Sequence, residues 1–240
     1  MIRLLVPGAS EGRCQVDGER LHYLSRVLRL REGDSLEVFD GQGQRFDARV
    51  AALNDARAEL ELSNRRVEPA ARSITIVQGL PKADKLELVL QKGTELGATA
   101  FVPAACARSI VKLDGKEEAK QARWQRIVEE AARQCRRADV PRVHAPAPLA
   151  AAVAALAPDT AVLVLDEEER AVPLSVAAAN ASPRPLALVI GPEGGLAREE
   201  VAALVARGAT PITLGALILR TETAALAALA VLRHLEGHLG

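Results

Sequence analysis

Apolar and polar residues alternate along the first part of the chain, as they do in short β-strands with one buried face. Strands are predicted at residues 36–39, 44–53 and 58–62. The segment Asp40-Gly-Gln-Gly43 supplies a tight turn between the first two strands. Ahead of them, Leu21, Leu24 and Leu28 recur at the spacing of one helix face, which predicts a short helix. The pattern indicates a small β-rich domain.

Beyond residue 73, short apolar runs alternate with longer segments of helical periodicity. Strands are predicted at 74–77, 100–102, 161–165, 186–190 and 212–214, and helices at 85–96, at 117–137 and onward from residue 222. This alternation is typical of an α/β fold in which a parallel sheet carries helices on both faces. Because Pro69 interrupts the chain between the two patterns, we expect one domain at 1–68 and a second at 69–240.

Two glycine-bearing loops follow apolar runs in the second domain. Ile190-Gly-Pro-Glu-Gly-Gly-Leu196 follows the first run, and Leu214-Gly-Ala-Leu-Ile-Leu-Arg-Thr-Glu-Thr-Ala224 follows the second. Glycines remove side chains where a backbone must approach something closely. Two strand-to-helix loops at the carboxyl ends of parallel strands predict a crevice for a small ligand. The loops lack both the Gly-Lys-Ser/Thr of a P-loop and the GxGxxG spacing of a dinucleotide fold.

These two loops, IGPEGGL and LGxxILRTETA, closely resemble those of the bacterial family that methylates N3 of a uridine in small-subunit ribosomal RNA (RsmE-like). That family belongs to the SPOUT methyltransferases. The resemblance covers essentially the whole chain, and it extends to the segments Tyr23–Arg29, Val38–Gly41, Leu80–Leu86, Gln91–Gly97, Arg108–Lys112 and Ala131–Arg137. It implies a PUA-like β-barrel that holds RNA at 1–68, and a SPOUT domain with a C-terminal trefoil knot at 69–240.

The resemblance also implies the activity. It is that of an S-adenosylmethionine-dependent methyltransferase acting on N3 of a specific uridine in 16S ribosomal RNA, with the small ribosomal subunit as partner and a homodimer as the working form. The helix at 224–232 is apolar on every side, which predicts burial on more than one side. Two alternatives stay open: a cofactor-binding RNA chaperone or assembly factor without turnover, and a SPOUT enzyme that methylates a ribose 2′-hydroxyl.

Carried over residue by residue, the resemblance assigns cofactor contacts to the two loops and to the end of the strand at 161–165. The predicted cofactor-binding residues are Leu165, Gly191, Glu193, Gly195, Leu214, Gly215, Leu219, Arg220, Thr221, Thr223 and Ala224. Closely spaced backbone groups with a few apolar walls are the usual lining of a small-molecule site.

Methylation of uracil N3 requires that its proton leave, because the protonated nitrogen is a poor nucleophile. Arg220 is the candidate that stabilises the developing anion, and Glu222 is the candidate base or orienting group. The alternatives are a salt bridge that holds the loop for Arg220, and a helix N-terminal charge for Glu222. Glu193 is expected to orient its loop.

Charge is unevenly distributed although the net charge is zero: residues 69–144 carry 14 Lys and Arg against 9 Asp and Glu. A local basic surface suits RNA phosphates, and a solvated helix face is the alternative. The predicted RNA-binding residues are Arg26, Arg29, Arg108, Lys112, Arg133 and Arg136. Trp124 is expected in the core rather than as a base-stacking platform.

Several positions depart from the family pattern. Leu217 stands where the family commonly has a basic residue, and Ala216 where proline is frequent. Arg133 and Arg136 replace the usual Glu and Gly at the end of the long helix. These changes bear on the RNA target more than on the fold or the cofactor.

Apolar runs and cysteine spacing bear on the cellular compartment and on metal binding. No apolar run approaches the length of a membrane span, and the first residues do not resemble a secretory signal, so the cytoplasm is the expected compartment. Cys14, Cys106 and Cys135 are too widely spaced for a metal site, and we expect packing roles for them and no metal.

Overall fold

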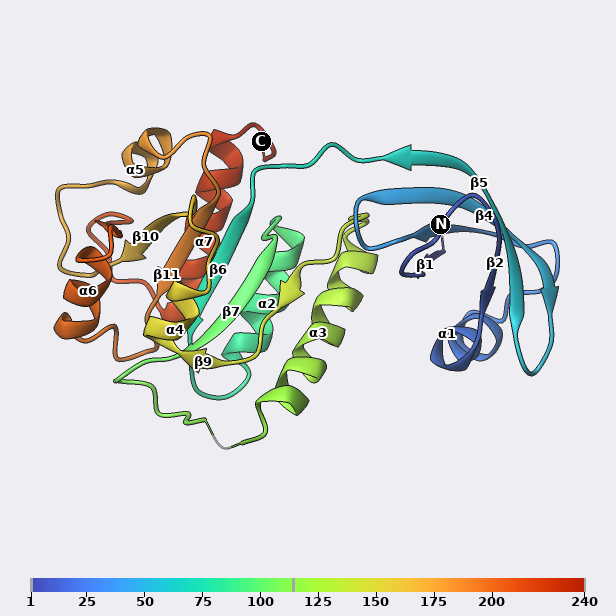
Figure 1. Ribbon diagram of the computed structural model, residues 1–240, viewed down its shortest axis with the longest axis horizontal. Helices are drawn as coiled ribbons and strands as arrows, with labels where there is room; N and C mark the ends of the chain where they lie inside the picture. The colour runs from blue at the N-terminus through green and yellow to red at the C-terminus, as the bar shows by residue number, and fades with distance from the viewer. Residues whose placement is uncertain (1, 114, 240) are drawn as a thin grey trace. The chain divides into compact units, whose positions relative to one another are not determined.

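The computed structural model describes residues 2–113 and 115–239, which form two compact units. The first unit comprises Met1–Ala71 together with Ala132–Val140, and the second comprises Arg72–Ala131 together with Pro141–Gly240. The first unit thus contains a segment, 132–140, that lies far along the chain from its other residues. Figure 1 labels the elements of both units.

The first unit is built on a five-stranded sheet whose strand order is β1-β3-β4-β5-β2. The strands are β1 (Arg3–Leu5), β2 (Gly12–Val16), β3 (Ser35–Phe39), β4 (Gln44–Leu53) and β5 (Ala58–Val67). Only β1 and β3 pair in parallel; the other pairs are antiparallel. The three predicted strands are therefore confirmed, with β5 five residues longer than expected.

Apolar side chains from one face of this sheet form a core with the predicted helix. The helix has two parts, α1 (Gly18–His22) and a π-helical turn, η1 (Tyr23–Val27). Leu24, Val38 and Phe46 are fully buried between them. Register shifts within the β4–β5 pair, at Arg45/Asp47 and Val50/Ala52, mark bulges, which bend a sheet around its core.

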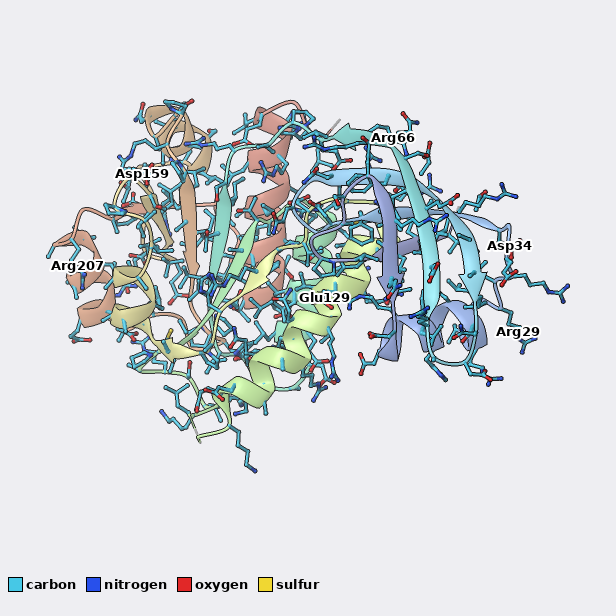
Figure 2. All side chains as sticks on the ribbon, turned by 45° about the vertical axis from the view of Figure 1, so that its right-hand side comes forward. Arg29, Asp34, Arg66, Glu129, Asp159 and Arg207 are labelled. Atoms are coloured by element: carbon cyan, nitrogen blue, oxygen red, sulfur yellow. The ribbon has the colours of Figure 1, made fainter. Side chains whose placement is uncertain are left out.

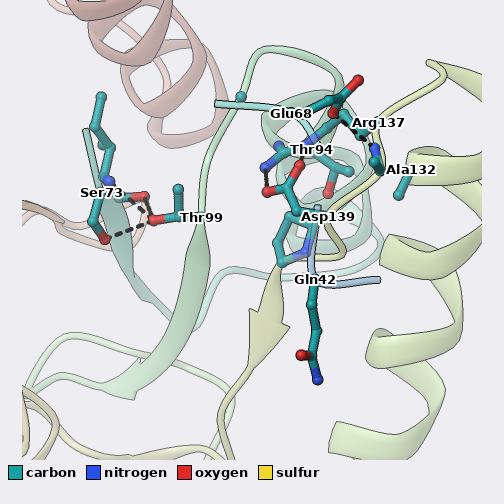
Figure 3. A network of polar contacts seen from close by, with 12 residues as sticks. Gln42, Glu68, Ser73, Thr94, Thr99, Ala132, Arg137 and Asp139 are labelled. Atoms are coloured by element: carbon teal, nitrogen blue, oxygen red, sulfur yellow. Dashed lines mark hydrogen bonds and ion pairs between the residues drawn. The ribbon is translucent and has the colours of Figure 1, made fainter. Parts of the chain in front are cut away.

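Polar contacts bind the segment 132–140 into the first unit, and Figure 3 shows part of this network. The backbone N–H of Ala138 donates to Glu68 Oε2 at 3.1 Å, and Arg137 pairs with Asp139 at 2.5 Å. Arg3, near the start of the chain, donates from Nη1 to the carbonyls of Ala132 and Arg133 at 3.5 and 3.4 Å. The bonds made by Arg3 and Ala138 thus link the first residues of the unit to the segment 132–140.

The second unit is an α/β layer structure whose seven strands all pair in parallel, as predicted. The strands are β6 (Ile74–Gly79), β7 (Ala100–Ala105), β8 (Arg142–Val143), β9 (Ala147–Pro148), β10 (Ala161–Leu165), β11 (Leu186–Ile190) and β12 (Thr210–Ile212). Their order is β12-β10-β11-β6-β7-β8, with β9 also paired to β7. β10 and β11 have the bounds that their apolar runs predict.

Helices cover both faces of this sheet, which confirms the sequence prediction (Figure 1). On one face, α4 (Leu149–Ala154) and α6 (Arg198–Val205) share a buried cluster with Val77, Val164 and Val189. On the other face, α7 (Thr221–Leu235) packs against α2 (Lys85–Glu95), α5 (Leu174–Asn180), β6 and β11. Side chains alternate between the faces along each strand, so each apolar run serves both layers.

The last helix, α7, is buried on one side and partly open on the other. Ala228, Leu229 and Leu232 are buried, whereas Val231 is 41% exposed and Leu235 53% exposed. The expected burial on more than one side is therefore incomplete within a single chain. An apolar helix with an uncovered side is a candidate interface.

The long helix α3 (Glu117–Gln134) ends three residues before the predicted limit. Arg136 follows it with φ +68°, in the left-handed region, and the N–H of Arg137 donates to the carbonyl of Ala132 at 3.1 Å. This is the hydrogen bond of a Schellman helix stop, whose left-handed position favours glycine. Trp124 of α3 is buried, as expected of a core residue.

The three cysteines carry free thiols, and Cys106 is buried. Burial, aided by the nearby Glu200 carboxylate, raises the pKa of the Cys106 thiol to about 12, as suits a packing residue. Among the described residues, His, Cys, Asp and Glu side chains form no group of three arranged to hold a metal ion. Within the same residues, every helix is too short or too polar to cross a bilayer.

Candidate active site

A cavity of about 400 Å³ opens at the carboxyl ends of β10, β11 and β12. Because parallel strands end at the same edge of a sheet, the loops that follow them, at 166–173, 191–197 and 213–220, converge there. The start of α2 contributes Lys85, and the start of α7 contributes Thr221 and Ala224. The crevice predicted from the two glycine loops is thus present.

The structure brings nearly all of the predicted cofactor-binding residues to this cavity. Its lining includes Leu165, Gly191, Glu193, Gly195, Leu214, Gly215, Leu219, Arg220, Thr221 and Ala224. Thr223 is the exception, because it is exposed on the outer side of α7 and does not line the cavity. A helix turns its neighbouring residues by about 100°, so Thr221 and Thr223 face different ways.

The glycine loop after β11 folds back tightly on itself. A Cβ added to Gly191 would lie 2.8 Å from both the carbonyl carbon of Gly195 and the nitrogen of Leu196. A side chain there would force the loop apart, so glycine is required. Gly215, in the other loop, has φ +116°, a conformation that L residues rarely adopt.

Buried hydrogen bonds join the glycine loop to α7 and to β6. The Thr221 hydroxyl donates to the Gly191 carbonyl at 2.5 Å. Gln78, which is 1% exposed at the end of β6, donates from Nε2 to Thr221 Oγ1 at 2.8 Å. Sequence analysis missed Gln78, although a polar residue at the end of a buried strand was a usable signal.

A cation bridges two carboxylates beside the cavity. Lys85 Nζ lies 3.0 Å from Glu193 Oε1 and 3.7 Å from Glu222 Oε2. Burial alone would raise the pKa of Glu193. Hydrogen bonds from its own backbone, from Lys85 and from the N–H of Lys82 hold that pKa below its usual value instead. Glu193 thus ties its loop to Lys82 and Lys85, which is compatible with an orienting role, and Lys85 was not predicted.

Glu222 stands at the start of α7 but is absent from the cavity lining. Its Oε2 is buried and accepts no hydrogen bond among the described residues. A carboxylate in the first turn of α7 is favoured by the helix dipole, and Lys85 at the start of α2 pairs with it. This position suits an orienting group better than a base that must reach a substrate directly.

A second ion pair, which was also not predicted, joins the loop after β10 to the start of α6 at the cavity wall. Arg198 donates to both carboxylate oxygens of Asp166, at 2.8 and 2.7 Å, and approaches Glu168 at 3.3 Å. These hydrogen bonds hold the pKa of Asp166 below its usual value. The acidic run after the strand at 161–165 could have indicated this pair, because polar residues at strand ends face the crevice.

Like Arg170, Arg220 is an exposed cation that lines the cavity. Its guanidinium forms no hydrogen bond or ion pair with any residue that the structure describes. A salt bridge that holds the loop, the alternative reading of this residue, is therefore not observed among those residues. An unpaired guanidinium in a cavity is available for an anionic group of a ligand or substrate.

The predicted RNA-binding residues lie in both units. In the second, Arg108 Nη1 donates to the Gly194 carbonyl of the glycine loop at 2.9 Å, and Lys112 is exposed. In the first, Arg26 is 3.7 Å from Asp55, and Arg29 lies on the outside of the unit (Figure 2).

The last two RNA candidates flank the end of α3. The Arg133 guanidinium stacks on the Tyr23 ring at 4.5 Å, and Arg136 is exposed. In the cavity loop, Leu217 and Ile218 are 81% and 80% exposed. A side chain at position 217 therefore lies at the surface.

Known proteins resemble the chain over nearly its full length. A family model described as an RNA methyltransferase domain matches residues 68–233, and one described as an RNA methyltransferase PUA domain matches residues 16–63. The ribosomal RNA small subunit methyltransferase E of Bacillus subtilis (strain 168) is 37% identical over 230 residues, which span 91% of this chain and 89% of the relative. That of Mycobacterium bovis is 39% identical over 221 residues, which span 89% and 83%.

A solved structure shows the same similarity in three dimensions. The ribosomal RNA small subunit methyltransferase E from Neisseria gonorrhoeae, bound to S-adenosyl methionine, superposes with a TM-score of 0.85. The two sequences are 31% identical, and the superposition covers 98% of each chain. The similarity therefore includes the PUA-like sheet and the α/β unit that carries the cavity.

Proposed function

The chain belongs to the ribosomal RNA small subunit methyltransferase E family of RNA methyltransferases, and on that premise we propose the reaction, cofactor and residues of its site. It transfers the methyl group of S-adenosylmethionine to N3 of a specific uridine in 16S ribosomal RNA. The observation that carries the proposal is the cavity in which both glycine loops of the family motif converge.

The cavity suits S-adenosylmethionine in size and chemistry. Its volume of about 400 Å³ falls within the range of about 300–1,000 Å³ usual for small-molecule sites. Leu165, Leu214 and Leu219 offer apolar walls for adenine, and the glycine loops offer backbone groups for the polar atoms. The N. gonorrhoeae relative contains this cofactor. When bound, it supplies the electrophilic methyl group.

Arg220 provides the electrostatic part of catalysis. As N3 of uracil loses its proton, negative charge spreads over N3, O2 and O4, and an unpaired guanidinium at the cavity stabilises that charge. Because Arg220 has no competing partner among the described residues, it need not break an ion pair first. Glu222, held by Lys85, orients the first turn of α7. Arg220 is the residue immediately before that helix, so its position depends on the same turn.

RNA is held by cations on both units: Arg26, Arg29, Arg133 and Arg136 on the first, and Arg108 and Lys112 on the second. Residues 1–68, which form one unit with 132–140, act as the RNA-holding domain, and the rest of residues 69–240 act as the catalytic domain. Because Arg108 also contacts the glycine loop, RNA bound there lies next to the cofactor cavity. The substrate is the small ribosomal subunit in the cytoplasm.

Two features of the SPOUT superfamily complete the proposal. The chain end forms a trefoil knot: α7 follows the edge strand β12, yet it packs against β6 and β11 in the middle of the sheet. The working form is a homodimer that buries the open apolar side of α7, including Val231 and Leu235.

Nucleoside analysis of ribosomal RNA from a strain that lacks the gene tests the reaction. We expect 3-methyluridine to disappear from 16S RNA and to return with the parent gene but not with Arg220→Ala. Loss of a ribose-methylated nucleoside instead would identify a 2′-hydroxyl methyltransferase. Unchanged nucleosides, with bound S-adenosylmethionine, would identify an assembly factor without turnover.

A further inference from the structure

We infer that Gln78 is a positioning residue of the methyltransferase site: it fixes the Thr221 hydroxyl and the Gly191 carbonyl so that the cavity wall is shaped for the cofactor. The inference rests on the proposed function, because it assumes that S-adenosylmethionine occupies the cavity. Gln78 does not line the cavity itself, and it acts through two residues that do.

The orientation of the Gln78 amide follows from its neighbours. Nε2 lies 2.8 Å from Thr221 Oγ1, 3.1 Å from the Gly79 carbonyl and 3.5 Å from the Gly191 carbonyl. Two of these three are acceptors only, so Oε1 cannot occupy the same place without repulsion. Nε2 is therefore the atom that faces the site.

The donation from Gln78 also sets the direction of the Thr221 hydroxyl. Since Oγ1 accepts from Gln78, its own proton must point elsewhere, and the Gly191 carbonyl lies 2.5 Å away. Hydroxyls otherwise rotate to suit their neighbours. The result is a fixed chain of hydrogen bonds from β6 through α7 to the glycine loop.

This chain joins segments that are remote in sequence and meet at the cavity wall. Gln78 is 143 residues from Thr221 and 113 residues from Gly191. Gly191 is followed by Pro192, so the next peptide nitrogen carries no proton that could hold the loop instead. The Gly191 carbonyl is therefore held from the side chains of Thr221 and Gln78.

Fold stability alone does not account for a glutamine at position 78. Its Oε1 is buried and accepts no hydrogen bond among the described residues. A buried acceptor without a donor is unfavourable, and an apolar side chain of similar shape would avoid it. Replacing Gln78 by methionine therefore removes an unfavourable group together with the favourable donor, and the fold should tolerate the change.

The test compares cofactor binding, turnover and melting temperature in matched variants. For Gln78→Met we expect Kd for S-adenosylmethionine to rise about tenfold, kcat at saturating cofactor to stay within about threefold, and Tm to stay near the parent value. Thr221→Val should raise Kd by a similar factor. Thr221→Ser, which keeps the hydroxyl, should bind S-adenosylmethionine with a Kd close to the parent value. Because Gln78 and Thr221 belong to one network, the double variant Gln78→Met/Thr221→Val should bind S-adenosylmethionine no more weakly than the single variant with the higher Kd.

Thr94→Val is the control, because Thr94 donates to the Leu90 carbonyl at 2.7 Å inside α2 and does not line the cavity. It should leave Kd unchanged. Parent-like Kd in a folded Gln78→Met, or equal weakening by Thr94→Val and Thr221→Val, would overturn the inference. Should Gln78→Met fail to fold, parent-like binding by Thr221→Val would overturn it. A parent protein that does not bind S-adenosylmethionine would contradict the proposed function itself.

Discussion

At the scale of single residues, the site is defined by which charges have partners and which do not. Glu193 and Glu222 share Lys85, and Asp166 pairs with Arg198. Arg220 has no such partner among the described residues, although it lines the same cavity. Paired charges hold loops in place, whereas the unpaired cation is free to act on a substrate. This difference separates the structural groups from the candidate catalytic group.

Arg220→Ala should reduce turnover far more than cofactor affinity. Removing one group that stabilises a developing anion typically costs a factor of about 100 to 1,000 in kcat. We expect a loss of that size, with Kd for S-adenosylmethionine within about threefold of the parent value. Radiolabel transfer and calorimetric titration provide the two numbers.

Arg207→Ala is a matched control, since Arg207 is an exposed arginine that does not line the cavity (Figure 2). It should behave as the parent. Equal turnover in Arg220→Ala and Arg207→Ala would rule out the catalytic assignment.

Because of the pair of Asp166 and Arg198, the free energy of unfolding should depend on pH in the acidic range. Hydrogen bonds from Arg198 hold the pKa of Asp166 below its usual value in the folded chain. The pair therefore stabilises the fold above the unfolded pKa of about 3.9, and this contribution is lost as pH falls through the lower, folded pKa. Because Arg198 is 39% exposed, water screens the pair, and we expect about 1 kcal/mol.

Urea unfolding of the parent and of Asp166→Asn checks this at two pH values. The variant should be less stable at pH 7, and the difference should shrink below about pH 4. Other carboxylates titrate equally in both proteins and cancel. A difference that stays constant over this range would show that the carboxylate charge is not what matters.

At the scale of elements, the end of α3 combines two demands on one residue. Arg136 occupies the left-handed position of a Schellman stop, where a side chain is strained, and it also presents a cation at the surface. Glycine would adopt this conformation without strain, whereas Arg136 adds a positive charge at the surface. We expect that charge to contribute to RNA binding.

Arg136→Gly should therefore stabilise the chain by about 1 kcal/mol and weaken RNA binding. Arg136→Ala removes the same charge but keeps the strain, so it should weaken RNA binding equally without the gain in stability. Thermal unfolding and filter binding of 16S RNA separate the two effects. Stabilisation by both substitutions, or by neither, would contradict the backbone argument.

Sequence patterns predicted the elements that are long enough to show a hydrophobic periodicity. The strands at 44–53, 161–165 and 186–190 match β4, β10 and β11, because continuous or alternating apolar runs directly reflect their burial. Two-residue strands such as β8 and β9 carry no period, and only their neighbours in the sheet define them. They could not be predicted from local sequence.

In the site, too, only the residues with a local sequence signal could be predicted. The glycine loops were predicted, because glycine at a strand end has a local meaning. Lys85, Gln78 and Arg198 were not, because each is defined by a partner elsewhere in the chain. Gln78 and Gly191, for example, are 113 residues apart. Local sequence patterns do not identify contacts between residues so far apart in the chain.

At the scale of the whole molecule, the open side of α7 bears on assembly. Val231 and Leu235 are large apolar residues that are 41% and 53% exposed. A homodimer that buries them would place the carboxyl ends of the two α7 helices at the shared interface. Val231→Asp should therefore yield monomers, because an unpaired charge is costly in an apolar interface.

Sedimentation equilibrium distinguishes the two forms at micromolar concentration. Leu88→Asp supplies a control, since Leu88 is similarly exposed, at 42%, but lies on α2. We expect it to leave the dimer intact. A parent chain that sediments as a monomer would remove the basis for the dimer.

We propose that the cavity binds S-adenosylmethionine and that its methyl group is transferred to uracil N3 in the small ribosomal subunit. The most direct test is transfer from methyl-labelled S-adenosylmethionine to small subunits isolated from a strain that lacks the gene, followed by nucleoside analysis. We predict label in 3-methyluridine of 16S RNA, and none with Arg220→Ala. Cofactor binding without label in subunits or naked RNA would contradict the claim.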